Sequence, residues 1–330
     1  MLRDLVRDMK VNFIVEDSGA FKYLGCATAA KNLYRALSKK VDISYNDSSL
    51  DFDITHFHTF GPRSLWYLHR FKGISIITAH STPNLNEGNL AIPGLVNWLY
   101  RPIYNRFDHI ISVSNKCKKE LFDMGCNPEI TTIYNGIDPS LFTPDNVKRK
   151  SFRKKHDLTD EDTLILTVAQ RTPRKGIYDF LEIAKRFPKY HFLWIGGFPY
   201  SFFSKDYNKI KKMLKKKPDN TLFPGFIEDI FEVYSAADFF LMPSFAEGHS
   251  IVMLEALSMK LPMIARDTEE YREAFNGMLF YFSRVEDLTK EAFSDSNKKK
   301  YQKKTDEVSL YHIEGIADQH TKLYEKLCDA

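Results

Sequence analysis

The chain has 330 residues, of which 43% are hydrophobic and 27% are charged, and its formal net charge is +4 at pH 7. These values exclude a disordered chain and predict a globular protein that is long enough for two domains. The small net charge argues against nucleic acid as the main partner.

No apolar run reaches the ~18 residues that a membrane-spanning helix needs, and the N-terminus lacks the apolar core of a signal peptide. The four cysteines show no Cys-x-x-Cys spacing, which favours free thiols in a reducing compartment. We therefore expect a cytoplasmic protein. The cysteines are Cys26, Cys117, Cys126 and Cys328.

The first half of the chain alternates short apolar runs with helical patterns. The runs predict strands at 11–15, 54–57, 74–79, 109–113 and 130–134. A segment with Ser18, Gly19 and Gly25 separates the first strand from a predicted helix at 27–37. Glycines at this point let a backbone approach a ligand closely, although the full Gly-x-Gly-x-x-Gly fingerprint is absent. The alternation predicts a parallel sheet covered on both faces.

The pattern pauses at 139–162, which we interpret as a linker because it contains two prolines and the basic run Lys148–Lys150. Strands are then predicted at 163–169, 192–195, 221–223, 238–242, 262–265 and 278–282. The fold class is therefore α/β, with two doubly wound, Rossmann-like domains that face each other across a ligand-binding cleft. We expect the domains to span 1–148 and 149–308.

One strand–loop–helix unit, read PSFAEGHSIVMLE over 243–255, offers the clearest chemistry. Glu247 lies in the loop and Glu255 in the helix, whose N-terminus has unpaired N–H groups and the positive end of the helix dipole. Two carboxylates beside an anion site suit a sugar nucleotide, which has both hydroxyls and phosphates. The alternative is a surface loop followed by an ordinary buried helix.

Four motifs together resemble the retaining glycosyltransferases of the GT-B fold, family four. They are Arg171-x-x-x-Lys175-Gly176, Gly225-Phe226, the Pro-Ser-x-x-Glu-Gly loop with a second Glu eight positions on, and Asn135-Gly136-Ile137-Asp138. The resemblance covers about residues 11–285. It implies that the last segment, 309–330, is a helix that crosses back to the N-terminal domain.

The sequence departs from the family pattern at three points. Gly25-Cys26 stands where the family has Gly-Gly, Lys260 where it often has Gly, and His249 where Phe is frequent. These departures leave the identity of the donor and acceptor open.

The resemblance assigns roles to the motif residues. Arg171 and Lys175 hold the diphosphate, Glu247 lies near the donor sugar, Glu255 accepts hydrogen bonds from the ribose hydroxyls, and His80 bonds a sugar hydroxyl. The remaining donor-binding residues are Gly25, Gly225, Gly248, His249, Ser250 and Ile251. The alternatives are a solvated basic face that includes Arg174, and a structural His80.

Three patterns of histidine or acidic residues are candidate metal sites. His56 and His58 share one face of a strand but lack an obvious third ligand. Asp51-Phe52-Asp53 precedes a strand, and Asp160-Glu161-Asp162 lies in the linker, so we interpret both as turns. We expect no essential metal ion and no cofactor besides the donor substrate.

The segment 92–107 mixes aromatic residues with Arg101 and Arg106. It predicts peripheral contact with an anionic membrane surface. The alternative is a helix that buries Trp98, Leu99 and Tyr104. The lysine-rich run 211–217 is interpreted as a solvated helix face.

The predicted activity is retaining transfer of a hexose from a nucleotide-diphosphate sugar to a hydroxyl of a lipid or glycan acceptor. UDP is favoured over GDP as the nucleotide. Two alternatives stay open at this point: a sugar-nucleotide epimerase on the same fold, and a non-catalytic protein that binds a glycan or partner on a transferase scaffold.

Overall fold

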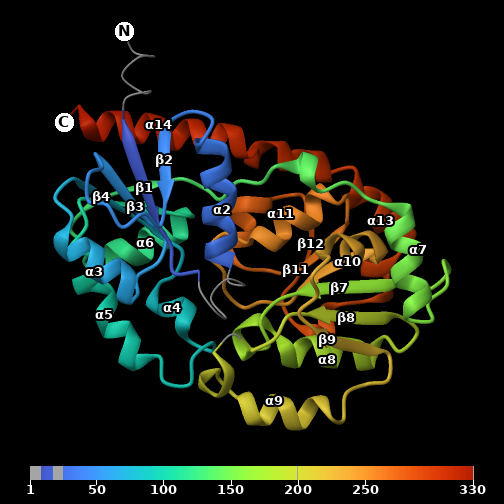
Figure 1. Ribbon diagram of the computed structural model, residues 1–330. Helices are drawn as coiled ribbons and strands as arrows, with labels where there is room; N and C mark the ends of the chain where they lie inside the picture. The colour runs from blue at the N-terminus through green and yellow to red at the C-terminus, as the bar shows by residue number, and fades with distance from the viewer. Residues whose placement is uncertain (1–8, 18–24, 199, 330) are drawn as a thin grey trace.

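The computed structural model describes residues 9–17, 25–198 and 200–329, and shows two parallel six-stranded sheets with helices on both faces (Figure 1). The predicted Ser18 and Gly19 lie outside the described residues. The expectation of two doubly wound domains is confirmed. The first sheet consists of β1 (Lys10–Ile14), β2 (Asp42–Tyr45), β3 (Ile54–Phe57), β4 (Ile74–Ala79), β5 (His109–Ser112) and β6 (Glu129–Thr132). The second consists of β7 (Leu164–Val168), β8 (His191–Ile195), β9 (Thr221–Gly225), β10 (Phe239–Met242), β11 (Met263–Arg266) and β12 (Leu279–Phe282).

The helices follow the alternation predicted from the sequence. The first half contains α2 (Gly25–Leu37), α3 (Pro62–Arg70), α4 (Pro83–Asn86), α5 (Gly94–Tyr104) and α6 (Asn115–Asp123). The second contains α7 (Asn146–Lys155), α8 (Ile177–Arg186), α9 (Tyr207–Leu214), α10 (Ile230–Ala236), α11 (Ile251–Ser258), α12 (Glu269–Phe275), α13 (Asp295–Gln302) and α14 (Ile313–Cys328).

The strand order places a topological switch point in each sheet. The orders are β2-β1-β3-β4-β5-β6 and β12-β11-β10-β7-β8-β9. In the second sheet the chain leaves β7 toward β8 and returns on the other side of β7 as β10, so the connections that follow β7 and β10 lead to opposite sides of the sheet and leave a crevice where they begin. Such a crevice at the carboxyl ends of parallel strands is where doubly wound folds bind ligands.

The strand β2 was not predicted. It is an edge strand whose residues alternate polar and apolar, and none of them is fully buried. It therefore lacks the continuous apolar run that marks the inner strands.

The segment interpreted as a linker contains helix α7, which packs against α10 of the second sheet. Arg149 and Arg153 both bond Asp238, at Nη–Oδ distances of 3.0 and 3.3 Å. Arg149 of the basic run is therefore structural, and residues 146–155 are not an irregular linker. The domain limits at 148 and 308 stay a prediction.

The chain passes between the two sheets twice, and the two passages run side by side. Ile137 N–H donates to Tyr311 O, and Ile313 N–H donates to Ile137 O, at 2.9 and 2.8 Å. A Cβ on Gly136 would lie 2.8 Å from Cδ1 and 3.0 Å from Cα of Ile313, so a larger residue here would have to displace the start of α14. After this junction α14 packs along α2 (Figure 1).

The C-terminal helix expected over 309–330 begins only at Ile313 as α14, and a 3-10 segment, Thr305–Tyr311, precedes it. Ile313, Ile316 and Leu323 are buried as their spacing predicts, but Leu310 is 69% exposed. The apolar stripe therefore begins only at α14.

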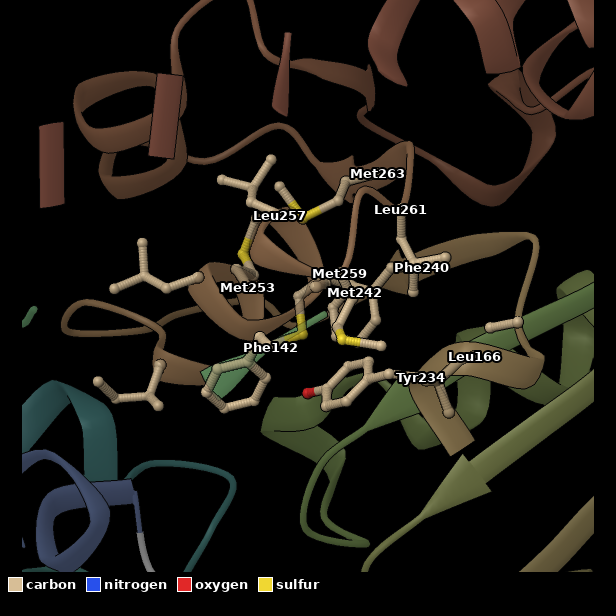
Figure 2. Packing of buried hydrophobic residues seen from close by; sticks show 14 of the residues in the cluster. Phe142, Leu166, Tyr234, Phe240, Met242, Met253, Leu257, Met259, Leu261 and Met263 are labelled. Carbon is tan, nitrogen blue, oxygen red and sulfur yellow. The ribbon is translucent and has the colours of Figure 1, made fainter. Parts of the chain in front are cut away.

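A methionine-rich part of the hydrophobic core packs between helix α11 and the strands β10 and β11 (Figure 2). Met253 and Met259 of this region pack with Met242 and Met263 of β10 and β11, and all four are buried. Methionine fills irregular gaps well, and this packing fixes the direction in which the N-terminus of α11 points.

Candidate active site

Two loops meet at the switch point of the second sheet: residues 169–176 after β7 and residues 243–250 after β10. Gly176 has φ of +75°, and a Cβ on it would lie 2.3 Å from Pro243 O. Phe245 N–H donates to Arg174 O at 2.8 Å. A glycine is therefore required where the two loops touch, which accounts for the Arg171-x-x-x-Lys175-Gly176 motif.

The predicted residues Lys175 and Glu247 form a buried ion pair between these loops. Lys175 Nζ lies 2.5 Å from Glu247 Oε1, and Ser244 Oγ donates to the same oxygen at 2.7 Å. Burial lowers the pKa of Lys175 to about 8, against the attraction of Glu247. Burial works to raise the pKa of Glu247, but Lys175 and Arg174 outweigh it and the pKa is lowered. The pair is therefore charged near neutral pH.

Arg174 belongs to the site, and its interpretation as part of a solvated face is wrong. Its side chain is 10% exposed, its Nη1 lies 3.7 Å from Glu247 Oε2, and it donates to Ala246 O. Arg171 lies nearer the start of the loop, where its Nη2 donates to Phe223 O of β9 at 3.1 Å and its guanidinium lies over the Phe223 ring. In this structure Arg171 thus contacts the end of β9 rather than Glu247.

Gly225 and Gly25 occupy different surroundings. Gly225 ends β9 with φ of +95°, and its carbonyl accepts from Gly196 N–H at 2.7 Å. Gly25 begins α2, and a Cβ on it would have none of the described residues within 4 Å beyond its chain neighbours and its own helix. A close approach of ligand at either glycine stays a prediction.

The loop of Glu247 also contacts the first domain at His80. A Cβ on Gly248 would lie 3.0 Å from Val113 Cγ2 and 3.5 Å from His80 O. Residues predicted for the donor and for the sugar's reacting face are thus adjacent across the cleft. Sequence spacing alone could not bring them together.

The His80 side chain is held by a second histidine. His80 Nε2 lies 3.3 Å from His58 Nδ1, and the rings are stacked. Burial lowers the pKa of His80 to about 4, so the ring is neutral at pH 7. Both histidines line an internal pocket with His320 of α14 and Asn135. The expectation that His80 bonds a sugar hydroxyl stays a prediction.

Glu255 lies in the first turns of α11 and is 9% exposed. Tyr234 Oη donates to its Oε2 at 2.7 Å. Burial raises the pKa of Glu255 to about 7, although the Tyr234 hydrogen bond acts in the opposite direction. A carboxylate at this point can accept both hydroxyls of a ribose once it is ionised.

His249 faces the interdomain junction with its ring. Its Nδ1 accepts from Asn135 N–H at 3.2 Å, its carbonyl accepts from Asn135 Nδ2 at 2.8 Å, and its ring stacks on Phe275. The Nδ1 side of the ring is therefore used in structural contacts, whereas Nε2 is buried with no hydrogen-bond partner among the described residues. Ser250 is the N-cap residue of α11 and Ile251 is its first residue, and both are buried.

Comparisons with known proteins match both halves of the chain to glycosyltransferase families. The family model "Glycosyltransferase Family 4" matches residues 21–141, and "Glycosyl transferases group 1" matches residues 148–306. Alpha-galactosylglucosyldiacylglycerol synthase of Streptococcus pneumoniae is 31% identical over 274 residues, which cover 79% of this chain and 71% of that protein. This chain is a family four glycosyltransferase.

Two further matches agree with the assignment. The processive diacylglycerol alpha-glucosyltransferase of Acholeplasma laidlawii is 28% identical to this glycosyltransferase over 271 residues, with 80% of each chain covered. The crystal structure of Anabaena HepE with UDP and glucose superposes with a TM-score of 0.78 and 15% identity, covering 96% of this chain and 100% of HepE. The second match supports the GT-B fold alone.

In this glycosyltransferase a loop of the first domain crosses the cleft beside the Lys175 loop. Asn89 and Thr172 are both buried, and Thr172 Oγ1 donates to Asn89 Oδ1 at 2.7 Å. Gly88 O accepts from Arg174 N–H at 3.2 Å, and Ala91 N–H donates to Phe203 O at 2.9 Å. We call residues 88–91 the strap. No sequence motif indicated the strap, because its partners lie more than 80 residues away along the chain. Asn89 and Thr172, for example, are separated by 83 positions.

The acidic pair Asp51-Phe52-Asp53 lies at the opposite edge of the first sheet. Asp53 Oδ2 accepts from the N–H of Lys10, at the start of β1, at 2.8 Å. The turn at 160–162 is confirmed. Among the described residues no group of three or more His, Cys, Asp or Glu side chains is placed to hold a metal ion. The expectation of a metal-independent enzyme stays a prediction.

Proposed function

We propose that this glycosyltransferase moves a hexose from a nucleotide-diphosphate sugar, with UDP as the favoured nucleotide, to a hydroxyl of a diacylglycerol glycolipid. The anomeric configuration is retained and no metal ion is needed. The acceptor class is taken from the relatives of Streptococcus pneumoniae and Acholeplasma laidlawii, whose names specify diacylglycerol lipids.

One observation carries the proposal. The buried pair Lys175–Glu247 lies at the switch point of the second sheet, and a Cβ on the neighbouring Gly248 would lie 3.5 Å from the carbonyl oxygen of His80 in the first domain. A diphosphate needs cations and the hexose needs hydrogen-bonding groups at its reacting face. The second domain therefore supplies the cations for the diphosphate, and the first domain supplies a hydrogen-bonding group for the hexose from across the cleft.

In the proposed reaction the diphosphate binds Lys175 and Arg174, and Arg171 contributes charge from the end of β9. Glu247 accepts hydrogen bonds from the hexose hydroxyls after Lys175 turns to the phosphate. Glu255 accepts from the ribose. These cations offset the negative charge that develops on the departing diphosphate.

The acceptor hydroxyl attacks the anomeric carbon from the face on which the diphosphate departs. The bond from that carbon to the phosphate oxygen breaks, the new glycosidic bond forms, and the acceptor proton passes to the phosphate oxygen. No covalent enzyme intermediate forms. Neutral His80 donates or accepts a hydrogen bond at the sugar without taking up a charge.

An activity screen tests this function. Purified protein is incubated with UDP-glucose, UDP-galactose or GDP-mannose and with diacylglycerol, monoglycosyl diacylglycerol or a soluble oligosaccharide, in the presence and absence of EDTA. We expect transfer from a UDP-sugar to a lipid acceptor, an α-linked product by NMR, and no effect of EDTA. Conversion of a UDP-sugar without an acceptor would favour the epimerase, and calorimetry that detects neither UDP nor GDP would favour a non-catalytic protein.

Contact with a membrane surface is the second part of the proposal, through residues 92–107. Trp98 and Ile92 are 66% and 68% exposed, and Arg101 and Arg106 are also exposed. Tyr104 and Ile103 face the core instead. The alternative that buries Trp98 is wrong, and an exposed Trp flanked by arginines suits the interface of an anionic bilayer.

Residues of the second domain extend this surface. The strap joins Ala91 to Phe203, and Phe202 and Phe203 are both exposed beside it. The lysine-rich helix α9 begins a few residues later, and α5 and α9 both lie on the lower side of the molecule in Figure 1. The described residues contain no helix that is long and apolar enough to cross a membrane.

A sedimentation assay tests the membrane contact. We expect the protein to bind vesicles with phosphatidylglycerol more strongly than vesicles of phosphatidylcholine alone, and Trp98→Ser to lose most of this binding. The matched control is Val147→Ser, because Val147 of α7 is even more exposed, at 79%. Equal binding by both variants would contradict the contact, while activity on a detergent-dispersed acceptor would still report on transfer.

A further inference from the structure

A carboxylate that no sequence motif indicated, Glu270, contacts both the donor loop and the other domain. Glu270 is 2% exposed, and lies in the first turn of α12. Its Oε1 accepts from Glu247 N–H at 2.8 Å, and its Oε2 lies 2.8 Å from Nζ of Lys116 in α6. One side chain therefore joins the backbone of Glu247 to the first domain.

A second carboxylate of α12 strengthens this contact between the domains. Glu273 lies on the same helix face as Glu270, three residues on. Its two oxygens accept from the N–H groups of Asn115 and Lys116 at 2.7 and 3.3 Å, and Tyr134 Oη donates to it at 2.5 Å. These N–H groups begin α6, where unpaired donors and the helix dipole favour a negative charge.

The contacts of Glu270 depend on the closed cleft. A carboxylate this deeply buried is costly unless it is paired. Its charged partner, Lys116, belongs to α6 of the first domain. When the cleft opens, Glu270 loses that partner, and its charge then favours turning toward water and away from Glu247 N–H.

The same contact gains importance when the donor binds. In the proposed reaction Lys175 leaves Glu247 for the diphosphate, so the side chain of Glu247 loses its strongest partner. The bond from Glu247 N–H to Glu270 then fixes the residue from its backbone. An error of ~1 Å in the position of such a group can lower turnover about 100-fold.

We propose that Glu270 is a positioning residue that couples closure of the cleft, through Lys116, to the orientation of Glu247. The inference rests on the role proposed for Glu247 at the donor sugar. Glu270 itself contacts the Glu247 backbone and does not need to touch the substrate.

Three variants separate the two contacts of Glu270. Glu270→Ala removes both, Lys116→Met removes only the contact between the domains, and Glu270→Gln keeps an amide oxygen for Glu247 N–H but loses the ion pair. The control is Glu269→Ala, the exposed neighbour on the same helix. For each variant kcat and the donor KM are measured separately, with thermal unfolding as the check on folding.

We expect Glu270→Ala to lower kcat ~10- to 100-fold with a smaller change in donor KM, because orientation and not uniform binding is lost. Glu270→Gln and Lys116→Met should each lower kcat only about 3- to 10-fold, and their combination should cost no more than either alone, since they break one interaction. Glu269→Ala should match the wild type.

Two outcomes overturn the inference: a kcat within twofold of wild type for folded Glu270→Ala, or fully additive effects of Glu270→Gln and Lys116→Met. A separate variant, Glu247→Gln, identifies which proposal fails. If Glu247→Gln is fully active, the role proposed for Glu247 is wrong. If it is inactive while Glu270→Ala is normal, only the coupling through Glu270 is wrong.

Discussion

At the scale of single residues, burial decides the protonation of the groups around the cleft. Lys175 and Glu247 keep opposite charges because they are paired, whereas the hydroxyl of Tyr234 is the only partner of the Glu255 carboxylate within the described part of the chain. Desolvation disfavours a charge that is not compensated. Two glutamates from one sequence motif therefore titrate in different pH ranges.

Replacing Lys175 tests the proposed role of the ion pair. We expect Lys175→Met to lower kcat about 100-fold or more, because a cation that stabilises the departing diphosphate is lost. Steady-state kinetics with the donor measures this. Lys185→Met on the exposed face of α8 is the control, and equal turnover of the two variants would contradict the role.

The raised pKa of Glu255, about 7, makes stability depend on pH. Between its ordinary pKa near 4.5 and 7, the unfolded chain loses this proton before the folded protein does, so Glu255 makes the protein less stable as pH rises. Glu255→Gln should therefore gain up to about 3 kcal/mol of unfolding free energy relative to wild type between pH 4.5 and pH 8. Urea unfolding across this range measures it, and a difference that does not vary with pH would contradict the assignment. The same variant should bind UDP more weakly in calorimetry.

At the scale of elements, the helix α11 ends in a way that explains one departure from the family. Lys260 has φ of +59°, and a Schellman motif joins Leu261 N–H to Ala256 O and Lys260 N–H to Leu257 O. This is the position at which helices usually carry glycine. The Gly that the family often has is thus a backbone requirement, which Lys260 meets with strain.

Lys260→Gly should therefore stabilise the protein by about 1 kcal/mol, because the left-handed conformation costs a side chain roughly that much. The ion pair of Lys260 with Asp306 is exposed, and its loss should matter little. Thermal unfolding measures the change. The control is Lys299→Gly inside helix α13, which should lower the free energy of unfolding by about 1 kcal/mol. If both substitutions changed the free energy of unfolding in the same direction, the explanation would be refuted.

At the scale of the whole molecule, three sets of contacts hold the cleft closed. The strap is hydrogen-bonded to Thr172, and α12 is hydrogen-bonded to the first N–H groups of α6. The two segments that connect the domains, at residues 137 and 313, run side by side. The strap and the α12–α6 contacts are polar and small, as expected of domains that move relative to one another, whereas the two passages also pack the buried Ile137 and Ile313. Closure can therefore be shifted by single substitutions.

Asn89→Ala should weaken the closed state, because it leaves the buried Thr172 hydroxyl without its partner. We expect the donor KM to rise about tenfold, which corresponds to ~1.4 kcal/mol. Asn84→Ala, an exposed asparagine of the neighbouring α4, is the control. An unchanged KM for Asn89→Ala would show that the strap does not contribute to donor binding.

The sequence by itself determined the elements, the α/β class and the motif residues of the second domain. These follow from local patterns: apolar runs between turns predict inner strands, and the motifs of Arg171 to Gly176 and of Glu247 to Glu255 each follow a predicted strand, which places both at the carboxyl edge of one sheet. The edge strand β2 was not predicted because its apolar pattern is weak, and helix α7 was not predicted because its sequence is mostly polar.

Only the tertiary structure decided which distant residues meet. Asn89 reaches Thr172, Glu270 reaches Lys116, and His58 reaches His80 from separate strands. Arg174 is part of the site, and not a surface residue, because the loop after β10 packs against it. Spacing along the chain determines what lies on one face of one element, whereas contacts between domains depend on how whole elements pack, and that packing is set by the sum of many weak interactions.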